Sequence, residues 1–281
     1  LIFPDNSAGA QADCALQIQG GTQRDPSKNA KHSFRVTFKK SYGPGQLKFP
    51  MFADSPVTDF NTFVLDGGIN YWWHYVGTTV PTDQRYRAQC IRDQFTSDLM
   101  AAMGNPAYHG KFFHLYLNGL YWGLHYVHER PDDDFAESYL GGDAADYDVI
   151  KNTSAGTEIV AGNLTAWNTA LALATPALAD NAQYELFQQY VSVDNLIDYM
   201  IVNHWAGNDD WPQHNWYVIR KRAPGEQFKF IVWDAEHVMK DVNINRTTID
   251  ATNSPAMMYN ALRNNAEFRL RFADHLQKHF F

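Results

Sequence analysis

The 281-residue sequence has few cysteines and no motif that pairs them as metal ligands. Cys14 and Cys90 are the only two, and no CxxC is present. A structural zinc site of the common kind is therefore not expected. The two thiols are compatible with one disulfide in a secreted protein, or with two free buried cysteines.

The sequence also lacks a hydrophobic run long enough to cross a bilayer. A spanning helix needs about 18 or more consecutive apolar residues, so we expect no membrane span. No signal peptide is present, yet the sequence starts at Leu1 rather than at a methionine, as a processed secretory protein or a trimmed chain would. We expect an extracellular or cell-envelope location.

Positive charge is scarce. Lys and Arg number 23 against 31 Asp and Glu, and the net charge is −8. A general nucleic-acid-binding protein usually carries a basic face, so nucleic acid is not an expected partner. A nucleotide remains compatible with this charge, because its site needs only a few local cations and a metal ion.

Apolar residues are plentiful, at 45%, and 15% of the chain is aromatic. The chain can therefore bury a large core, and some rings are available to line a cleft. Alternation and turn residues predict strands at 33–38 and 61–65, a short apolar segment at 47–52, and a hairpin over 111–127 that turns at Asn118–Gly119. Helical spacing predicts a helix over 88–103.

The second half is richer in predicted helices. They cover 132–140, 164–179 and 194–205, and two strands follow at 216–220 and 228–233. Strands that come first and helices that come later are typical of an α+β protein. No internal repeat interrupts this order, and a boundary is expected near 129–134.

Four acidic residues lie after the predicted helix 194–205 and after the predicted strand 228–233. Asp209 and Asp210 lie after the helix, and Asp234 and Glu236 lie at the end of the last strand. Carboxylates brought together at the mouth of a hairpin repel one another unless a cation lies among them. The pattern predicts a metal site.

The spacing between Asp210 and Asn215 is Asp-x-x-x-x-Asn, which in kinases places a carboxylate at the accepting hydroxyl and an amide on a metal ion. On this interpretation Asp210 is the base, Asn215 and Asp234 are metal ligands, and Glu236 is an additional ligand. The same residues are also compatible with structural roles, since Asn215 can cap a turn and Asp234 can cap the segment after its strand.

Other polar and aromatic groups admit two interpretations each. His204, His214 and His237 lie near the acids, where they can pack or be solvated, or can serve a metal-dependent phosphohydrolase, although no HExxH is present. The aromatic run 71–75 can stack on a sugar or fill the core. Residues 132–134 can bind a metal or start a helix. Arg85, Arg87 and Arg92 can hold phosphate or form surface ion pairs.

Five segments together resemble the CotH family, which is named for a bacterial spore-coat kinase. The hairpin and the last two segments are the more specific ones, and the match spans about residues 20–240. The segments are, in the family's order, 31–38 with 42–43, 92–95, 116–124 leading to Glu129, 208–217 and 233–236.

The resemblance implies one two-lobed, atypical protein-kinase-like domain over residues 1–281. The sheet-rich N-terminal lobe would cover 1–130, the mostly helical C-terminal lobe 131–281, and ATP would bind between them. Asp210 matches the catalytic acid and Asp234 the metal-binding acid. Lys31, with Arg35 as the second choice, is expected to contact the phosphates, and Glu129 the nucleotide.

The implied activity is transfer of the γ-phosphoryl group of ATP to a Ser or Thr hydroxyl of a protein acceptor, with Mg²⁺, Mn²⁺ or Ca²⁺. The chain departs from the family at residues 233–236, where the family's Trp-Asp-x-Asp is replaced by Trp-Asp-Ala-Glu. A glycine-rich phosphate loop is represented only by Gly20–Gly21, and the helix at 88–103 offers no glutamate. The alternatives are a nucleotide-binding pseudokinase scaffold, a metal-dependent phosphohydrolase and an extracellular adhesion or carbohydrate-binding module.

Overall fold

The computed structural model describes residues 1–281 except positions 4, 6, 22–23, 28, 69–71, 73–87 and 176. The chain divides into two compact units. Unit 1 comprises residues 1–90 and 108–130, and unit 2 comprises residues 91–107 and 131–281. That these units correspond to the lobes of a kinase stays a prediction.

Unit 1 is built on a five-stranded antiparallel sheet with the order β1-β2-β5-β7-β6. The strands predicted at 33–38 and 61–65 are confirmed, whereas β1 lies in a stretch whose polarity gave no strand signal. A small second sheet pairs β3 with β4. The strands are β1 (Ala15–Gln19), β2 (Ser33–Thr37), β3 (Leu47–Lys48), β4 (Asp59–Phe60), β5 (Thr62–Asp66), β6 (Gly110–Leu117) and β7 (Leu120–His128).

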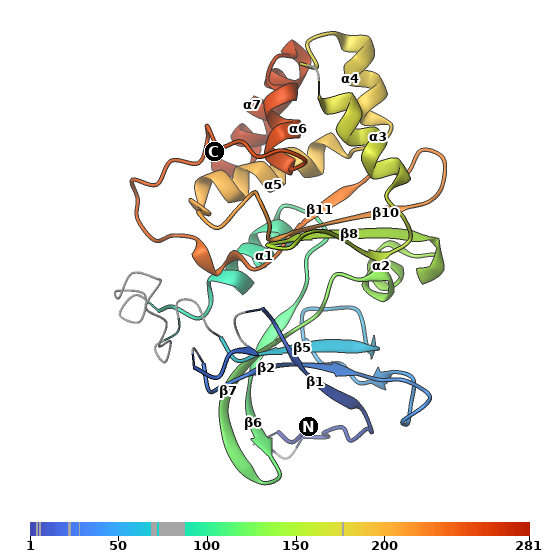
Figure 1. Cartoon of the computed structure of the whole chain (residues 1–281), viewed down its shortest axis with the longest axis vertical. Helices are drawn as coiled ribbons and strands as arrows, with labels where there is room; N and C mark the ends of the chain where they lie inside the picture. The colour runs from blue at the N-terminus through green and yellow to red at the C-terminus, as the bar shows by residue number, and fades with distance from the viewer. Residues whose placement is uncertain are drawn as a thin grey trace. The chain divides into compact units, whose positions relative to one another are not determined.

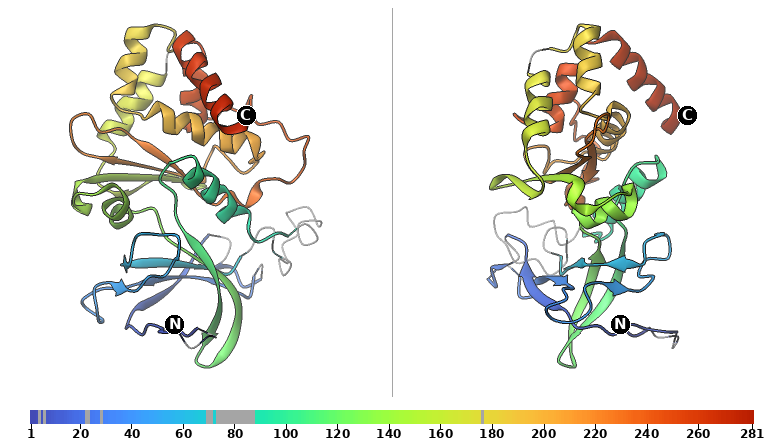
Figure 2. Two further views of the ribbon diagram at one scale, coloured as in Figure 1. Left: turned by 180° about the vertical axis from the view of Figure 1, so that it is seen from behind. Right: turned by 90° about the vertical axis from the view of Figure 1, so that its right-hand side faces the viewer.

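The predicted hairpin is the longest feature of this sheet (Figure 2). Asn118 and Gly119 form its two-residue turn, with φ angles of 51° and 82°. Positive φ at both central residues is what a type I′ turn requires, and the twist of that turn matches the twist of the two strands. The Asn-Gly signal therefore fixed both the turn and the pairing of β6 with β7.

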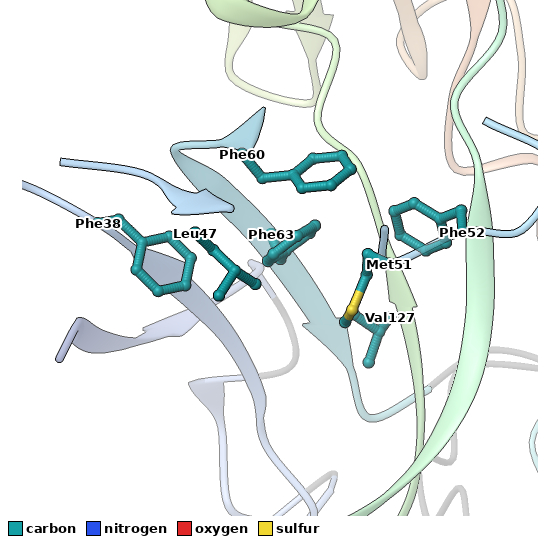
Figure 3. Close-up of a cluster of buried hydrophobic side chains, with 7 residues drawn as sticks. All are labelled: Phe38, Leu47, Met51, Phe52, Phe60, Phe63 and Val127. Atoms are coloured by element: carbon teal, nitrogen blue, oxygen red, sulfur yellow. The ribbon is translucent and has the colours of Figure 1, made fainter. Parts of the chain in front are cut away.

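The core of unit 1 lies on one face of the sheet, under the loops that carry β3 and β4 (Figure 3). Phe60 and Phe63 approach to 4.8 Å between ring centroids, and Phe52 packs edge-on against both. These aromatic side chains pack with Val36 of β2 and Leu65 of β5, which lie two positions from Phe38 and Phe63 and so on the same face of the sheet. The buried cluster is Phe38, Leu47, Met51, Phe52, Phe60, Phe63 and Val127.

Unit 2 contains a four-stranded antiparallel sheet with the order β11-β10-β8-β9. The two strands predicted before and after residue 225 are confirmed as β10 and β11. Their partners β8 and β9 were not predicted, so strands also occur within the helical half. The strands are β8 (Tyr147–Thr153), β9 (Gly156–Ala161), β10 (Trp216–Lys221) and β11 (Lys229–Val232).

Helices α3 to α7 gather on one side of this sheet (Figure 1). Helix α5 is buried over most of its length and packs on β11. Trp167 of α3 packs against Trp216, Phe228 and Phe230 at centroid distances of 5.5, 5.3 and 6.2 Å. The helices are α1 (Arg92–Ala102), α2 (Asp133–Leu140), α3 (Thr165–Ala174), α4 (Asn181–Gln188), α5 (Val193–Trp205), α6 (Pro255–Leu262) and α7 (Ala266–Phe280).

The mixture of helices and antiparallel sheets confirms the α+β class. The helix predicted over 88–103 starts later, at Arg92, and its apolar positions Ile91 and Phe95 are exposed. Its buried face carries Thr96, Ser97 and Met100 instead. The helix predicted over 164–179 ends at Ala174.

Cys14 and Cys90 form no disulfide with each other, Cys14 is exposed and Cys90 is partly buried, so neither the disulfide nor a pair of buried thiols describes them. Of the residues that the structure describes, none belongs to a helix both long and apolar enough to cross a bilayer.

Candidate functional site

The loop that carries Asp210 is held between buried tryptophans. It follows α5, and the indole of Trp211 donates to the hydroxyl of Tyr199 on that helix at 2.7 Å. The indole of Trp216, at the start of β10, donates to the carbonyl of Pro212 at 3.0 Å. Both rings are fully buried. The two tryptophans therefore anchor the loop, with His214 and Asn215 between them and Asp210 directly before Trp211.

Asp210, His214 and Asn215 form a hydrogen-bonded group within this loop. The Nε2 of His214 lies 3.0 Å from Asp210 Oδ1. The Nδ2 of Asn215 donates to both Oδ2 and the backbone carbonyl of Asp210, each at 3.0 Å. Asn215 itself has a positive φ of 65°, a conformation that asparagine tolerates better than most residues. Both oxygens of the Asp210 carboxylate are thus oriented.

The charges of Asp210 and His214 support each other. The hydrogen bond from His214 lowers the pKa of Asp210, with help from the charge of His237 and from Asn215. The same bond raises the pKa of His214, and the charge of Asp234 adds to that rise. The two side chains therefore form an ion pair, and Asp234 lies close enough to act on His214.

Asp234 follows β11 and has a left-handed backbone, with φ 52° and ψ 43°. The next residue, Ala235, donates its N–H to Oδ1 of Asp93 on α1 at 2.7 Å. Ala206, Ala235 and Val238 pack together, which fixes the turn against the end of α5. In the described chain the side chain of Asp234 makes no capping hydrogen bond to the short helix at Ala235–His237, so the capping role considered from sequence is not observed.

The neighbouring acid Asp209 has a different environment. Its Oδ2 lies 2.8 Å from the amine of Lys240, and its Oδ1 lies 3.5 Å from Nδ1 of His237. Its backbone N–H donates to the carbonyl of His237 at 3.3 Å, and Met239 N–H donates to Ala206 O at 2.7 Å. These contacts join the loop after α5 to the loop after β11. Asp209 thus supports the position of Asp210.

The residue types in these two loops are those that a hard divalent cation prefers. Among the described residues, the groups of three or more His, Cys, Asp or Glu ligand atoms within 4.8 Å of one another lie elsewhere, so a cation held by these loops stays a prediction. Asp210, Asp234 and Glu236 offer carboxylate oxygens, which Mg²⁺ and Ca²⁺ prefer. The Nδ2 of Asn215 donates to Asp210, and its Oδ1 is the acceptor atom of the amide. Glu236 lies in the short helix Ala235–His237, two residues after Asp234.

The third predicted histidine of this region is not part of the group. His204 packs edge-on against Trp211 and Tyr259, at centroid distances of 6.2 and 5.2 Å. Burial lowers the pKa of His204 to about 4, so its ring is neutral at pH 7. Its role is packing, one of the two interpretations that the sequence allowed.

Lys31 lies in unit 1, two residues before β2. Its amine donates to the carbonyl of Leu124 and lies 4.5 Å from the ring centroid of Trp72. Gly123 lets the side chain pass, since a Cβ there would lie 3.1 Å from the Cε of Lys31. Burial lowers the pKa of Lys31 to about 8, against the opposing attraction of Asp66. This amine is unusually easy to deprotonate.

The other two residues predicted to contact nucleotide are also in unit 1. Arg35 lies in β2, and its Nη2 donates to Gln17 of the neighbouring strand at 3.0 Å. Glu129 is buried at the end of β7, where its Oε2 accepts from the backbone N–H of His109 at 2.8 Å and lies 2.9 Å from the ring Nδ1 of the same residue. Contact of either residue with a nucleotide stays a prediction.

Several predicted features are structural or lie outside the described residues. Asp132 caps α2 by accepting from Phe135 N–H at 3.2 Å, which confirms the helix start at 132–134. Ligand atoms of the three aspartates also lie within 4.8 Å of one another, so their metal interpretation stays a prediction. Of the aromatic run 71–75 the structure describes Trp72, which is buried. Arg85 and Arg87 lie outside the described residues.

Sequence reasoning missed two supporting residues. His214 is four positions after Asp210, a spacing that could have suggested the pair, but the sequence interpretations of His214 are a packed or solvated side chain and a ligand of a hydrolase. Asp93 gave no signal for its contact with Ala235, because the two are 142 positions apart.

Comparison with protein families gives one match. The model of the family described as CotH kinase protein covers residues 16–280, nearly the whole chain. No curated protein matches the chain.

Proposed function

The chain belongs to the CotH kinase family, and from that premise we propose that it is an ATP-dependent phosphotransferase that acts on a Ser or Thr hydroxyl of a protein acceptor. A kinase-like phosphotransferase is the activity that the family suggests. The acceptor and the roles of individual residues are the finer part of the proposal.

The observation that carries the proposal is the hydrogen-bonded group around Asp210. Its carboxylate is oriented by Asn215 and charge-stabilised by His214. Phosphoryl transfer asks a protein mainly for positioning and for charge stabilisation, since the covalent chemistry is simple. A fixed carboxylate next to further acids and an amide supplies the residue types for both.

We assign the role of catalytic base to Asp210. Its lowered pKa keeps the carboxylate ionised at neutral pH, so it can accept a hydrogen bond from the attacking hydroxyl and take its proton as the new O–P bond forms. The bond between the γ-phosphorus and the bridging oxygen breaks in the same transfer, and ADP leaves with that electron pair.

Asp234, the Oδ1 of Asn215 and Glu236 would hold the divalent cation. When bound, such a cation supplies charge neutralisation to the phosphate oxygens. The left-handed turn at Asp234 is held by Asp93 and by the packing of Ala235, so the carboxylate is kept on a rigid support. Glutamate in place of the family's second aspartate keeps the charge on a longer side chain.

Lys31 is the amine that we assign to the phosphates, with Arg35 as the second choice and Glu129 as a nucleotide contact. A buried amine with its pKa lowered to about 8 is still mostly charged at pH 7 and would attract phosphate oxygens. The amine of Lys31 would then leave the carbonyl of Leu124 and bind a phosphate oxygen instead.

The test is incorporation of label from γ-labelled ATP with Mg²⁺ or Mn²⁺, on the protein itself and on a generic Ser/Thr acceptor. Wild type is compared with Asp210→Ala and Asp234→Ala. Asp250→Ala is the matched control, because Asp250 is an exposed aspartate that belongs to neither loop. We expect label with wild type and Asp250→Ala, and a loss of about 100-fold or more in the two site variants.

The other outcomes select the alternatives. Metal-dependent ATP binding without label would indicate a pseudokinase scaffold. Release of phosphate from simple phosphoesters without ATP would indicate a phosphohydrolase. Neither ATP binding nor hydrolysis, together with retention on a polysaccharide, would indicate a binding module and overturn the proposal.

A further inference from the structure

A second group of histidine and carboxylate side chains joins α5 to α7, two helices that pack together in unit 2 (Figure 1). The carboxylate of Asp198 projects from α5, and His275 and His279 project from α7, four positions apart. One ligand atom of each residue lies within 4.8 Å of the other two. None of the three belongs to the loops that carry Asp210 and Asp234.

Asp198 is buried with its negative charge. Its side chain is 5% exposed, and Oδ1 lies 2.6 Å from Nδ1 of His275 and 3.2 Å from Nε2 of His279. Its other oxygen accepts from the amide of Asn105 at 2.8 Å. Among the described residues, the ion-pair partners of Asp198 are these two histidines. A carboxylate buried to this degree is costly unless a positive charge compensates it.

The contacts of His275 also indicate that a positive charge is needed beside Asp198. Its Nε2 lies 3.1 Å from Oδ1 of Asp194, one turn earlier on α5. A neutral imidazole carries a single N–H. If that proton is on Nε2 and is donated to Asp194, Nδ1 directs a lone pair at Asp198 Oδ1 over 2.6 Å. This contact between two acceptors is favourable only with a second proton or a metal ion.

We propose that Asp198, His275 and His279 bind one divalent transition metal ion of the zinc class, through a carboxylate oxygen, Nδ1 and Nε2 respectively. The site ties α7 to α5, and it is separate from the hard-cation site assigned to Asp234. A solvent molecule completes the coordination, as in zinc sites with three protein ligands.

The distances from Asp198 Oδ1 to the two histidine nitrogens need only a small change to match those around a zinc ion. Ligand atoms around a tetrahedral zinc ion at 2.0–2.1 Å are about 3.3 Å apart. Asp198 Oδ1 and His279 Nε2 are already 3.2 Å apart. His275 Nδ1 has to withdraw from Oδ1 by roughly 0.7 Å, from the 2.6 Å of a hydrogen bond to that spacing. Both histidine side chains are 14% exposed, which gives an ion a path from solvent.

The donor set determines the class of metal. Imidazole nitrogens suit zinc, cobalt, nickel and copper, whereas Mg²⁺ and Ca²⁺ prefer oxygen. The surrounding groups resemble those that support known metal ligands. Asp194 accepts from the second nitrogen of His275 and is itself bound by Arg271, and Asn105 orients Asp198. Such outer contacts fix the tautomer and raise the basicity of the ligating ring.

The experiment uses the full chain with Asp234→Ala, which removes the principal acid assigned to the other metal site. Co²⁺ and Zn²⁺ are titrated into the chelator-treated protein, with the visible absorption of Co²⁺ and competition against a chromophoric chelator as readouts. We expect one equivalent of Co²⁺ with a tetrahedral spectrum, displaced by Zn²⁺ and not by millimolar Mg²⁺.

Added variants assign that site. His279→Ala and His275→Ala should each weaken Zn²⁺ binding by more than about 100-fold, and Asp194→Asn by about 10- to 100-fold. His114→Ala is the control, because His114 is exposed on the β6–β7 hairpin of unit 1. Melting of each variant without metal shows whether it is folded, and His279, with its exposed neighbours, is the safest position to change.

Two results would overturn the proposal. The first is no Co²⁺ or Zn²⁺ bound by the Asp234→Ala chain. The second is binding whose stoichiometry and affinity are unchanged in both His275→Ala and His279→Ala. In either case the group acts as a hydrogen-bonded contact between helices, and the phosphotransferase proposal is unaffected.

Discussion

The backbone N–H of Ala235 donates to Oδ1 of Asp93 at 2.7 Å, and this bond ties the turn that presents Asp234 to the first turn of α1. Asp234 has a left-handed backbone, which is less favourable for a non-glycine residue. The acceptor from α1 and the buried side chain of Ala235 together hold that conformation. The position of the proposed metal ligand therefore depends on a residue from a distant part of the chain.

Replacement of Asp93 should reduce activity through Asp234. Asp93→Ala removes the acceptor and leaves the N–H of Ala235 unsatisfied, at a cost of about 1–3 kcal/mol in the free energy of unfolding. Asp93→Asn keeps an oxygen at the same place and should retain most of the stability. We expect Mn²⁺ affinity and label transfer to fall in Asp93→Ala and to fall much less in Asp93→Asn. Equal affinities in wild type and Asp93→Ala would contradict the supporting role.

Replacement of His214 should shift the acidic limb of the pH–activity profile to higher pH. His214 lowers the pKa of Asp210, so His214→Ala should let that pKa rise toward its ordinary value. Activity that needs ionised Asp210 would then be lost at a higher pH than in wild type. The measurement is the pH dependence of label transfer for wild type, His214→Ala and the control His114→Ala. An unchanged acid limb would mean that His214 does not act on the base.

The same ion pair predicts a pH window for stability. The lowered pKa of Asp210 stabilises the folded chain above pH 3.8, and this stabilisation is lost as the pH falls through the pKa of the folded state. The raised pKa of His214 stabilises the folded chain fully below pH 6.5, and this stabilisation is lost as the pH rises through the pKa of the folded state. The free energy of unfolding of wild type, measured in urea, should therefore exceed that of His214→Ala most between pH 3.8 and 6.5, by about 1 kcal/mol or less for this partly exposed pair.

Lys31 should cost stability at neutral pH and yet be needed for phosphate binding. Its pKa is about 8 in the folded chain and 10.5 ordinarily, so the unfolded chain binds more protons between these values and stability rises with pH. Lys31→Met should be more stable than wild type at pH 7, with the difference shrinking toward pH 10. ATP binding should be weakened in Lys31→Met and retained in Lys39→Met, which removes an exposed lysine. Normal ATP affinity in Lys31→Met would transfer the role to Arg35.

Local signals gave the parts of the fold that depend on neighbouring residues. The Asn118–Gly119 turn and the capping carboxylate of Asp132 act within a few positions, so they could be predicted from the sequence. Helix α1 was predicted with the wrong start, because its buried face is polar and serves a contact with Ala235. Strands β8 and β9 show no alternation that would predict them, because β8 has four consecutive buried residues and β9 has four consecutive exposed ones.

The candidate site could be predicted as a list of residues and not as an arrangement. Asp210 and Asn215 are separated by one loop, and their spacing carries the signal. Asp234 reaches the same neighbourhood only because β10 and β11 pair and the two loops are joined through Asp209 and His237. Contacts of that kind depend on the folded chain, and no local pattern specifies them.

Two replacements of Asn215 separate its backbone role from its amide. The residue has a φ of 65°, which glycine adopts without strain and alanine adopts at a cost of about 1–2 kcal/mol. Both Asn215→Gly and Asn215→Ala lose the hydrogen bonds to Asp210, so both should lose label transfer and at least about 10-fold in Mn²⁺ affinity if the amide is a ligand. Only Asn215→Ala should show the additional loss of stability in urea. If Asn215→Gly keeps activity and metal affinity, the residue serves the turn alone, and the cation must be held by Asp234 and Glu236.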